Sequence, residues 1–263
     1  MVATTESGYL APPLPGFVTA HRVAVVATTE SGYRGTPDLT RATVVPGNRA
    51  LKCAAGQSRS NIQQDAKMHD RLDMLKAELE RFGETNDSSI DEPSRQMFNA
   101  TRNTGEFLAL MVVATAARRI LEIGTSNGYS TLWLAEGGDT VRGSVTTVER
   151  AAYKLRLASA NFARSGLAHL ITLVNGEAAP FLRGTESSAY DLIFLDSERR
   201  EYVGWWPNVR RALRPGGLLI VDNATSHTQE LAPFRSLVSA DPQFATCVVP
   251  VGKGEFLAVK DLP

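Results

Sequence analysis

Two apolar segments of this chain end in side chains that can bind a cation. Asp196 follows the run "YDLIFL", and Asp222 and Asn223 follow the run "GGLLIV". If the two segments are neighbouring parallel strands, their carboxyl ends meet at one rim of a sheet and these side chains converge. Two carboxylates and an amide oxygen are hard ligands, which suit Mg²⁺ and, as alternatives, Mn²⁺ or Ca²⁺. Each residue alone has a simpler explanation, with Asp196 orienting a turn and the other two capping the next helix.

A glycine-containing loop, "ILEIGTSNGYS", follows an earlier apolar strand. A P-loop requires a lysine after its second glycine, whereas Tyr129 follows Gly128 here. The dinucleotide pattern G-x-G-x-x-G also fails, because Ser126 occupies the second glycine position and blocks the close approach of a pyrophosphate. S-adenosylmethionine has no phosphate. It needs only a tight turn with room for its methionyl part, which Gly124 and Gly128 provide, with Glu122 behind them.

The strand after this loop ends in a glutamate. Glu149, in "SVTTVER", stands where a carboxylate accepts hydrogen bonds from the hydroxyls of a ribose. The same acid also suits the ribose of NAD, and a tight turn with an exposed glutamate is the plain structural alternative. Together, the loop and Glu149 favour S-adenosylmethionine over NAD.

The remaining pattern shows which elements position these residues. Apolar strands are predicted at 119–124, 144–149, 169–174, 190–196 and 217–222, and helices at 129–136, 151–165, 177–183 and 199–212. Strands that alternate with helices form right-handed crossovers and a buried parallel sheet. A further helix starts near Ser226, and "FATCVVPVGKGEFLAVK" predicts a hairpin. The sequence therefore predicts an α/β fold with a doubly wound, mostly parallel sheet of about seven strands and a C-terminal antiparallel hairpin.

Extra helices are predicted before the sheet. One carries apolar residues at helical spacing and stops at Gly83; the apolar residues are Met68, Leu72, Leu75, Leu79 and Phe82. Two more are predicted at 93–101 and 105–117. Residues 1–62 are rich in proline and lack periodicity, which predicts a disordered extension. We therefore divide the chain into this extension and a domain over 63–263, with helices in 63–117 and a Rossmann-like core in 118–263.

Composition limits the partners and the compartment. Lysine plus arginine and aspartate plus glutamate each number 28, so no electrostatic feature points to nucleic acid or an anionic membrane. Two cysteines form no disulfide framework and fit a reducing, cytoplasmic location. The apolar run 107–117 is too short to cross a bilayer, and we expect no signal peptide. The first predicted helix could pack on its own domain or on a second subunit, so a homodimer is expected.

Four motifs together resemble a known family. "RRILEIGTSNGYSTLWLA", "VTTVER", "FLDSERREY" and "LRPGGLLIVDN" are similar to the class I S-adenosylmethionine-dependent O-methyltransferases. The likeness is closest to the cation-dependent group that includes catechol and caffeoyl-CoA O-methyltransferases, and it covers about residues 68–260. It implies a Rossmann-like methyltransferase fold, S-adenosylmethionine, a divalent cation such as Mg²⁺, and transfer to a hydroxyl of a small aromatic acceptor.

The resemblance also implies roles for individual residues. Glu149 would bind the ribose, and Glu177 and Ala178 would contact the adenine. The methionyl part would be lined by Asn103, Thr104, Gly124, Ser126 and Ser130, with Glu122, Gly128 and Asp196 adjoining the cofactor. Asp196, Asp222 and Asn223 match the metal ligands.

One position departs from the family pattern. Members of the catechol type carry a lysine, often assigned as general base, three residues after the first metal aspartate, and this chain has Arg199 there. Arginine does not release its proton in proteins, so Arg199 would orient an anionic substrate instead. His227 is an alternative base, although an exposed histidine at a helix start is the simpler explanation. Catalysis is thus expected to involve Asp196, Arg199 and His227, with the metal activating the hydroxyl.

Other functions remain open at this point. A metal-independent methyltransferase of another small molecule, an NAD-dependent oxidoreductase and an inactive cofactor-binding protein are alternatives. Many methyltransferases of amino groups carry an Asp/Asn-Pro-Pro-aromatic run, which the segment 196–199 lacks. An aromatic stripe follows that segment at helical spacing. It is expected to pack in the core or, as an alternative, to wall an aromatic acceptor; its members are Tyr202, Trp205, Trp206, Val209 and Leu213.

Overall fold

A computed structural model of the chain describes the backbone of residues 59–262 and the side chains from His69 onward. The predicted N-terminal extension lies outside the described residues, except that 59–62 form the first turn of α1 (Arg59–Ser89). No described helix combines the length and the apolar character that crossing a bilayer requires.

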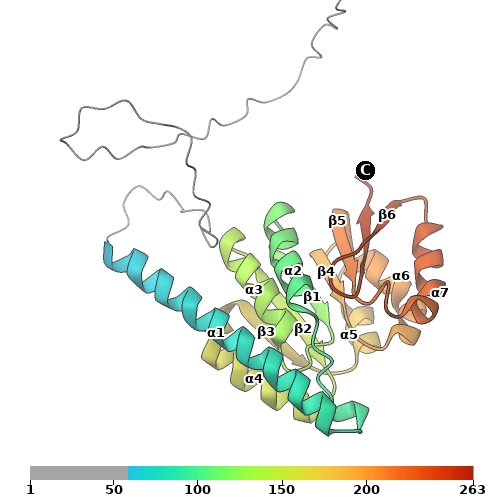
Figure 1. Cartoon of the computed structure of the whole chain (residues 1–263). Coiled ribbons are helices and arrows are strands. Elements are labelled where there is room, and N and C mark those ends of the chain that lie inside the picture. Colours follow the sequence, from blue (N-terminus) through green and yellow to red (C-terminus); the bar gives the residue numbers. More distant parts are fainter. Residues whose placement is uncertain (1–58, 263) are drawn as a thin grey trace, which may run out of the picture. The chain divides into compact units, whose positions relative to one another are not determined.

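The described part of the chain is built around a seven-stranded sheet in the order β3-β2-β1-β4-β5-β7-β6 (Figure 1). The strands are β1 Arg119–Ile123, β2 Ser144–Glu149, β3 Ile171–Asn175, β4 Tyr190–Leu195, β5 Leu213–Val221, β6 Phe244–Val249 and β7 Glu255–Lys260. Strands β1 to β5 pair in parallel, whereas β7 is antiparallel to both β5 and β6. The predicted doubly wound sheet with its antiparallel hairpin is therefore confirmed. Strand order reverses at β1, so a ligand site is expected beyond the carboxyl ends of β1 and β4.

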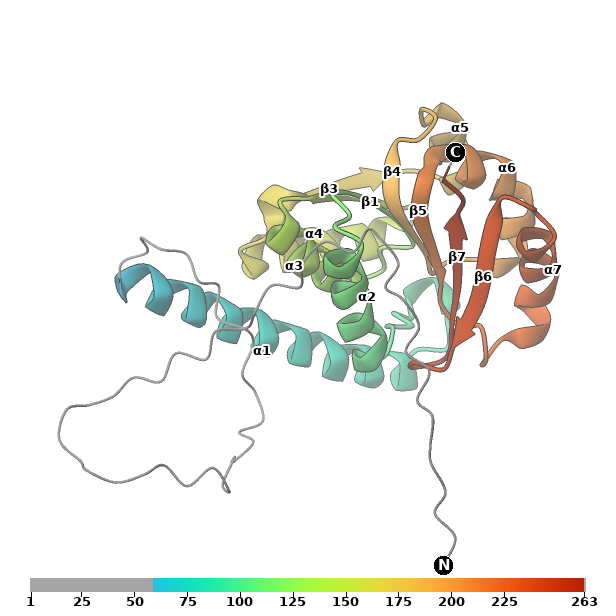
Figure 2. The ribbon, with the colours of Figure 1, turned by 90° about the horizontal axis from the view of Figure 1, so that it is seen from above.

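Helices cover both faces of the sheet (Figure 2). Besides α1, they are α2 Arg102–Ala114, α3 Tyr129–Val141, α4 Ala152–Ser165, α5 Ala178–Gly184, α6 Tyr202–Ala212 and α7 Thr228–Ser239. Because side chains alternate along a strand, each central strand contributes side chains to two hydrophobic cores, one on each face of the sheet. Ile120 and Phe194 pack with the helices α1 to α4, whereas Leu121 and Leu195 pack with α5, α6 and α7. Strands buried on both faces explain the nearly continuous apolar runs of the sequence.

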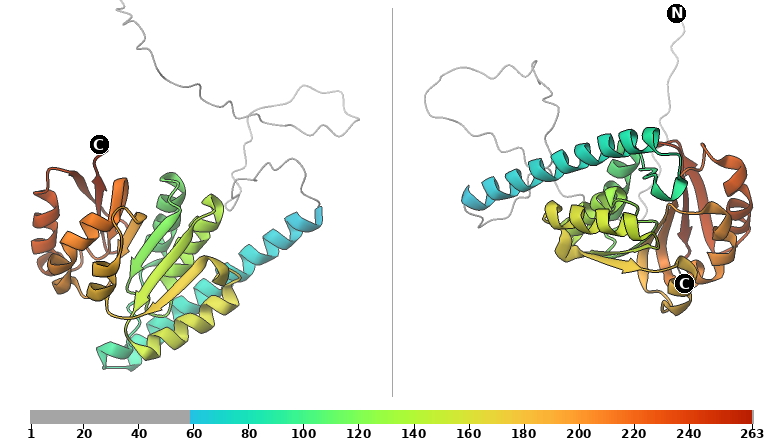
Figure 3. Two further views of the ribbon diagram at one scale, coloured as in Figure 1. Left: turned by 180° about the vertical axis from the view of Figure 1, so that it is seen from behind. Right: turned by 90° about the horizontal axis from the view of Figure 1, so that it is seen from below.

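Helix α1 is longer than predicted and does not stop at Gly83. It runs to Ser89 and lies alongside α4 (Figure 3). Its Leu72, Leu75 and Leu79 are buried in the domain's own core, as the packing alternative predicts. Gly83 has another use, since a Cβ there would lie 2.5 Å from the side-chain nitrogen of Asn99. The missing side chain therefore lets the following segment pass close to the helix.

The predicted helix over 93–101 is wrong. Only Pro93–Arg95 form a single 3₁₀ turn, and the rest of the segment is non-helical up to α2, with Phe98 at a φ of 50°. The carboxylate of Asp87 accepts hydrogen bonds from the backbone N–H groups of Met97 (2.6 Å) and Phe98 (2.8 Å). These donors are thus satisfied by a side chain instead of by helical carbonyls. This non-helical segment leaves its side chains available to line a cavity.

Candidate active site

A cavity of about 550 Å³ opens beyond the carboxyl ends of β1, β2, β4 and β5, where strand order reverses. Its lining comes from the segment 93–100, the loop after β1, the ends of β2 and β4, residues that follow β5, and the β6–β7 turn. A smaller cavity of about 40 Å³ adjoins it between β1, β2, β4 and α5, and the two share Gly124 and Glu149. We call these the large and the small cavity.

The loop after β1 requires glycine at its first position. Gly124 has a φ of 105°, a region that L-residues rarely adopt. A Cβ there would also overlap the backbone carbonyl oxygen of Asp196. Ser126 turns the loop at a φ of 49° and donates its hydroxyl to the carbonyl of Met97 (2.7 Å). Gly128 begins α3 at a φ of 89°, and it does not line either cavity. The loop is therefore tied to the non-helical segment that faces it.

Glu149 joins this loop to the end of β2. One of its carboxylate oxygens accepts from the backbone N–H of Arg150 (2.9 Å) and of Ala151 (2.8 Å), and the other accepts from Ser126 N–H (3.0 Å). A carboxylate offers about four acceptor positions, so roughly one remains for a ligand. Glu149 lines both cavities, which places this remaining position where they meet.

Glu122 lies beneath the loop and is fully buried. Its carboxylate accepts hydrogen bonds from the hydroxyls of Ser130 (2.6 Å) and Thr147 (2.6 Å), and also from that of Thr131. Burial raises the pKa of Glu122 to about 7, although the three hydroxyls oppose this rise. Glu122 does not line the cavities, but it orients Ser130, which does. It therefore supports the start of α3.

This pKa gives a pH dependence of stability. Since the pKa of Glu122 rises from 4.5 to about 7 on folding, its contribution is fully present below pH 4.5 and is lost as the pH rises through 7. The loss amounts to about 3 kcal/mol of unfolding free energy at most. Glu122→Gln should reduce the fall in unfolding free energy between pH 5 and pH 8, measured by urea denaturation. Glu186→Gln, at an exposed position, serves as the control; an equal fall in wild type and Glu122→Gln would contradict the assignment.

The acidic strand ends lie on adjacent strands. The backbone N–H of Asp196 donates to Ile123 (3.0 Å) and that of Asp222 donates to Leu195 (3.2 Å), so the ladders continue to these residues. Asp196 and Asn223 line the large cavity, whereas Asp222 is 3% exposed and lies behind it. Burial and the negative charges of Asp222 and Glu122 raise the pKa of Asp196 well above its usual range.

A third carboxylate reaches this region from β7, and the sequence analysis did not identify it. Glu255 is fully buried, and the hydroxyl of Thr104 donates to one of its oxygens (2.9 Å). Among the described residues, its other oxygen has no hydrogen-bond partner. Burial and the charge of Asp222 raise the pKa of Glu255 to about 9. The available signal was an acid at the start of the otherwise apolar strand "EFLAVK".

Two residues predicted for the methionyl pocket lie outside the cavity lining. Thr104 is buried against Glu255, and Asn103 is exposed in the first turn of α2. The wall of the large cavity is formed instead by the segment 93–100, which is mostly non-helical. Met97 and Phe98 from that segment line the large cavity.

Arg199 and His227 both line the large cavity. The guanidinium of Arg199 pairs with Glu230 (3.0 Å) and donates to the amide oxygen of Asn223 (3.4 Å). The ring of His227 lies 2.9 Å from the hydroxyl of Ser226, and the residue directly precedes α7. Lys253, in the turn between β6 and β7, completes this side of the cavity and was not identified from the sequence.

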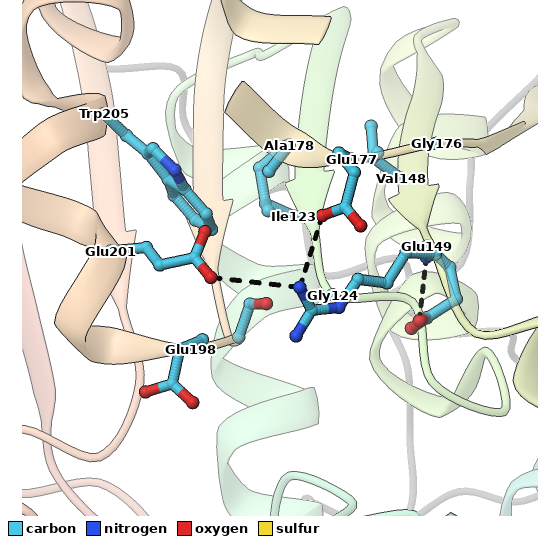
Figure 4. A pocket seen from close by; sticks show the side chains of 12 residues that line it. Ile123, Gly124, Val148, Glu149, Gly176, Glu177, Ala178, Glu198, Glu201 and Trp205 are labelled. Atoms are coloured by element: carbon cyan, nitrogen blue, oxygen red, sulfur yellow. Dashed lines mark hydrogen bonds and ion pairs between the residues drawn. The ribbon is translucent and has the colours of Figure 1, made fainter. Parts of the chain in front are cut away.

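Glu177 and Ala178 line the small cavity, together with Trp205 (Figure 4). Arg150 also lines this cavity and pairs with Glu177 (3.3 Å) and with Glu201 (3.9 Å). The predicted stripe is packed in the core, as the simpler prediction has it, although its last member, Leu213, begins β5 instead of belonging to α6. Trp206, for example, contacts Phe234 and Phe244 edge-on.

The residues at the β4 and β5 ends fit a hard divalent cation in their chemistry. Asp196, Asp222 and Asn223 offer two carboxylates and an amide oxygen, and the nearby Glu255 oxygen lacks a hydrogen-bond donor among the described side chains. Buried negative charges that raise each other's pKa are stabilised by a cation. In the described part of the chain, no three His, Cys, Asp or Glu side chains are arranged to hold a metal. The candidate set of cation ligands therefore needs the amide oxygen of Asn223 in addition to the two carboxylates.

The fold and this site define a class I methyltransferase domain, with the glycine turn after β1 and the acid after β2. The chain belongs to the O-methyltransferase family, whose profile matches residues 76–261. It is by family an S-adenosylmethionine-dependent O-methyltransferase.

Individual proteins show the same likeness. A catechol O-methyltransferase from Mycobacterium tuberculosis is 37% identical over 119 residues, which are 45% of this chain and 54% of that protein. This chain thus spans about half the length of that relative. An O-methyltransferase from Bacillus cereus, solved in complex with S-adenosylhomocysteine, is 26% identical with a TM-score of 0.61, over 72% of this chain and 91% of that one. One from Streptomyces achromogenes, solved with S-adenosylmethionine, is 25% identical with a TM-score of 0.58, over 69% and 88%.

Proposed function

We propose that this protein transfers a methyl group from S-adenosylmethionine to one hydroxyl of a small aromatic vicinal diol, with the help of a divalent cation. The observation that supports this most directly is the convergence of Glu149, Asp196 and Asn223 on one cavity at the point where strand order reverses. The likeness to a catechol O-methyltransferase agrees with a diol acceptor.

The cofactor is proposed to lie across Gly124, from the small cavity into the large one. Glu177 and Ala178 would flank its adenine, Glu149 would accept from its ribose, and Ser126 and Ser130 would face its methionyl part. Its sulfonium supplies an activated methyl group. The chain's task is then to align an acceptor oxygen with that methyl group, and alignment alone can be worth about 7–11 kcal/mol.

Asp196, Asp222 and Asn223 would hold the cation. When bound, a divalent cation lowers the pKa of an acceptor hydroxyl and fixes two vicinal oxygens. Arg199 occupies the position of the family's lysine and cannot accept a proton, so it is proposed to act through its charge. His227 lines the same cavity and is a candidate proton acceptor.

The test is an assay of the purified chain with S-adenosylmethionine, Mg²⁺ and either catechol or phenol. Catechol should yield a monomethyl ether detected by mass spectrometry, and phenol should react at least about tenfold more slowly because it has a single oxygen to fix. Chelation with EDTA should remove most of the turnover of catechol and with it this preference. Equal turnover of the two acceptors, unaffected by EDTA, would instead support the metal-independent alternative. S-adenosylhomocysteine, but not NAD, should raise the Tm.

A further inference from the structure

The large cavity has two walls of different character. One wall is apolar and aromatic, with Met97, Phe98 and Tyr129. The other carries basic side chains from three separate elements, namely Arg199 after β4, His227 at the start of α7 and Lys253 in the β6–β7 turn. We call this the basic wall. It lies beside Asp196 and Asn223, where the proposed function places the acceptor.

The turn that carries Lys253 is fixed in place. The carbonyl oxygen of Lys253 accepts from the backbone N–H groups of Thr225 and Ser226 (3.1 Å each), and the hydroxyl of Thr225 also donates to it (2.6 Å). The N–H of Ala224 donates to the carbonyl of Gly254 (2.7 Å). A Cβ at Gly254 would lie 2.5 Å from the Thr225 side chain. The turn is therefore docked on the segment that directly follows Asn223.

The ion pairs of the cavity leave the ammonium group of Lys253 available. Arg199 is paired with Glu230, and Arg150 is paired with Glu177 and Glu201. Among the described residues, Lys253 has no ion pair and no side-chain hydrogen bond. It lines the large cavity together with Asp196 and Asn223.

A second lysine serves the cofactor end of the cavity. Lys154 of α4 is half-buried, lies 6.0 Å from the centre of the Phe98 ring, and interacts electrostatically with Glu149 first and also with Asp87 and Asp196. The methionyl part of S-adenosylmethionine carries one carboxylate, and Lys154, beside the ribose-binding Glu149, is placed to balance that negative charge. Lys253, on the turn of the C-terminal hairpin, is then left for a negative charge on the acceptor.

On the basis of the proposed function, we propose that the acceptor is an aromatic diol that bears a carboxylate, and that Lys253 binds this carboxylate. Lys253 lines the same cavity as Asp196 and Asn223, where the diol would lie. Its ammonium stands on a flexible four-carbon stem, which can reach an anionic substituent of the ring. Arg199, already paired, would add to the positive potential without binding the anion itself.

The test compares catechol with 3,4-dihydroxybenzoate, in wild type and in Lys253→Met, Lys253→Arg and the control Arg183→Met, which removes an exposed positive charge on α5. Wild type should prefer the benzoate by at least about tenfold in kcat/KM, as a charge-assisted hydrogen bond gives. Lys253→Met should abolish this preference, mainly through the KM for the benzoate, and Lys253→Arg should restore most of it. The control should keep the wild-type ratio.

Three outcomes would overturn the inference. They are a wild type without preference for the benzoate, an equal loss for both acceptors in Lys253→Met, and a preference that survives that substitution. An equal loss would mean that Lys253 only balances the buried carboxylates. Failure of wild type to methylate either diol, while it binds S-adenosylhomocysteine in calorimetry, would instead contradict the proposed function itself.

Discussion

Asp222→Asn is expected to slow methyl transfer to catechol by about a hundredfold or more, because the cation loses a charged ligand worth several kcal/mol in the transition state. Binding of S-adenosylhomocysteine should persist, since Asp222 is 3% exposed and lies behind the cavity lining. The substitution keeps the shape of the side chain and an oxygen for the backbone N–H of Asn223, which donates to Asp222 over 2.6 Å. Steady-state kinetics and calorimetry with S-adenosylhomocysteine measure the two effects separately.

The same variant gives a readout that does not depend on activity. Without divalent cations, Asp222→Asn should be more stable than wild type by about 1–3 kcal/mol, because it removes a buried charge and its amide can donate to the unpartnered oxygen of Glu255. Millimolar Mg²⁺ should raise the Tm of wild type by linkage and leave the variant nearly unchanged. This pair of results is expected if the proposed cation needs the carboxylate of Asp222 as a ligand.

Asp139→Asn, the same change near the end of α3, is the matched control and should behave as wild type in both measurements. A variant that keeps wild-type turnover would contradict the role of Asp222. So would a Tm that responds to Mg²⁺ as strongly in Asp222→Asn as in wild type.

The sheet could be predicted from the sequence because its central strands β1, β4 and β5 are largely buried on both faces and therefore stand out as apolar runs. The residues that end parallel strands, such as Glu149 and Asp196, lie at the ligand-binding edge of the sheet because of the topology alone. The segment 93–101 could not be predicted in this way. Its conformation depends on the Asp87 carboxylate, which satisfies two backbone N–H groups that helix propensity alone would assign to carbonyls.

The residues that escaped prediction reach the site from the C-terminal hairpin. Glu255 and Thr104 are 151 residues apart and meet only because β7 inserts beside β5. Lys253 joins the cavity through backbone hydrogen bonds to Thr225 and Ser226, which leave no pattern in the sequence. Long-range pairings of this kind also explain why Thr104, expected beside the cofactor, is instead buried against Glu255.

Glu149→Gln is expected to weaken binding of S-adenosylhomocysteine between about tenfold and a hundredfold, the range given by one lost hydrogen bond to a charged group. The carboxylate holds three backbone N–H groups, from Arg150, Ala151 and Ser126, and has about one acceptor position left. An amide has a single oxygen, so its NH₂ group would face an N–H donor and the loop after β1 would loosen. Calorimetry measures the affinity, and Tm verifies folding.

A deoxy analogue of S-adenosylhomocysteine separates two effects of Glu149→Gln, namely the loss of the hydrogen bond to the ribose and the loosening of the loop after β1. Wild type should bind the 2′-deoxy or 3′-deoxy analogue of S-adenosylhomocysteine more weakly than the parent, whichever hydroxyl Glu149 accepts from. Glu149→Gln should discriminate less between them, because the acceptor of that hydroxyl is already lost. Glu186→Gln, an identical change on the exposed turn after α5, should retain wild-type affinities. Full discrimination by Glu149→Gln would place the ribose away from this carboxylate and remove the basis on which the cofactor is oriented toward Asp196.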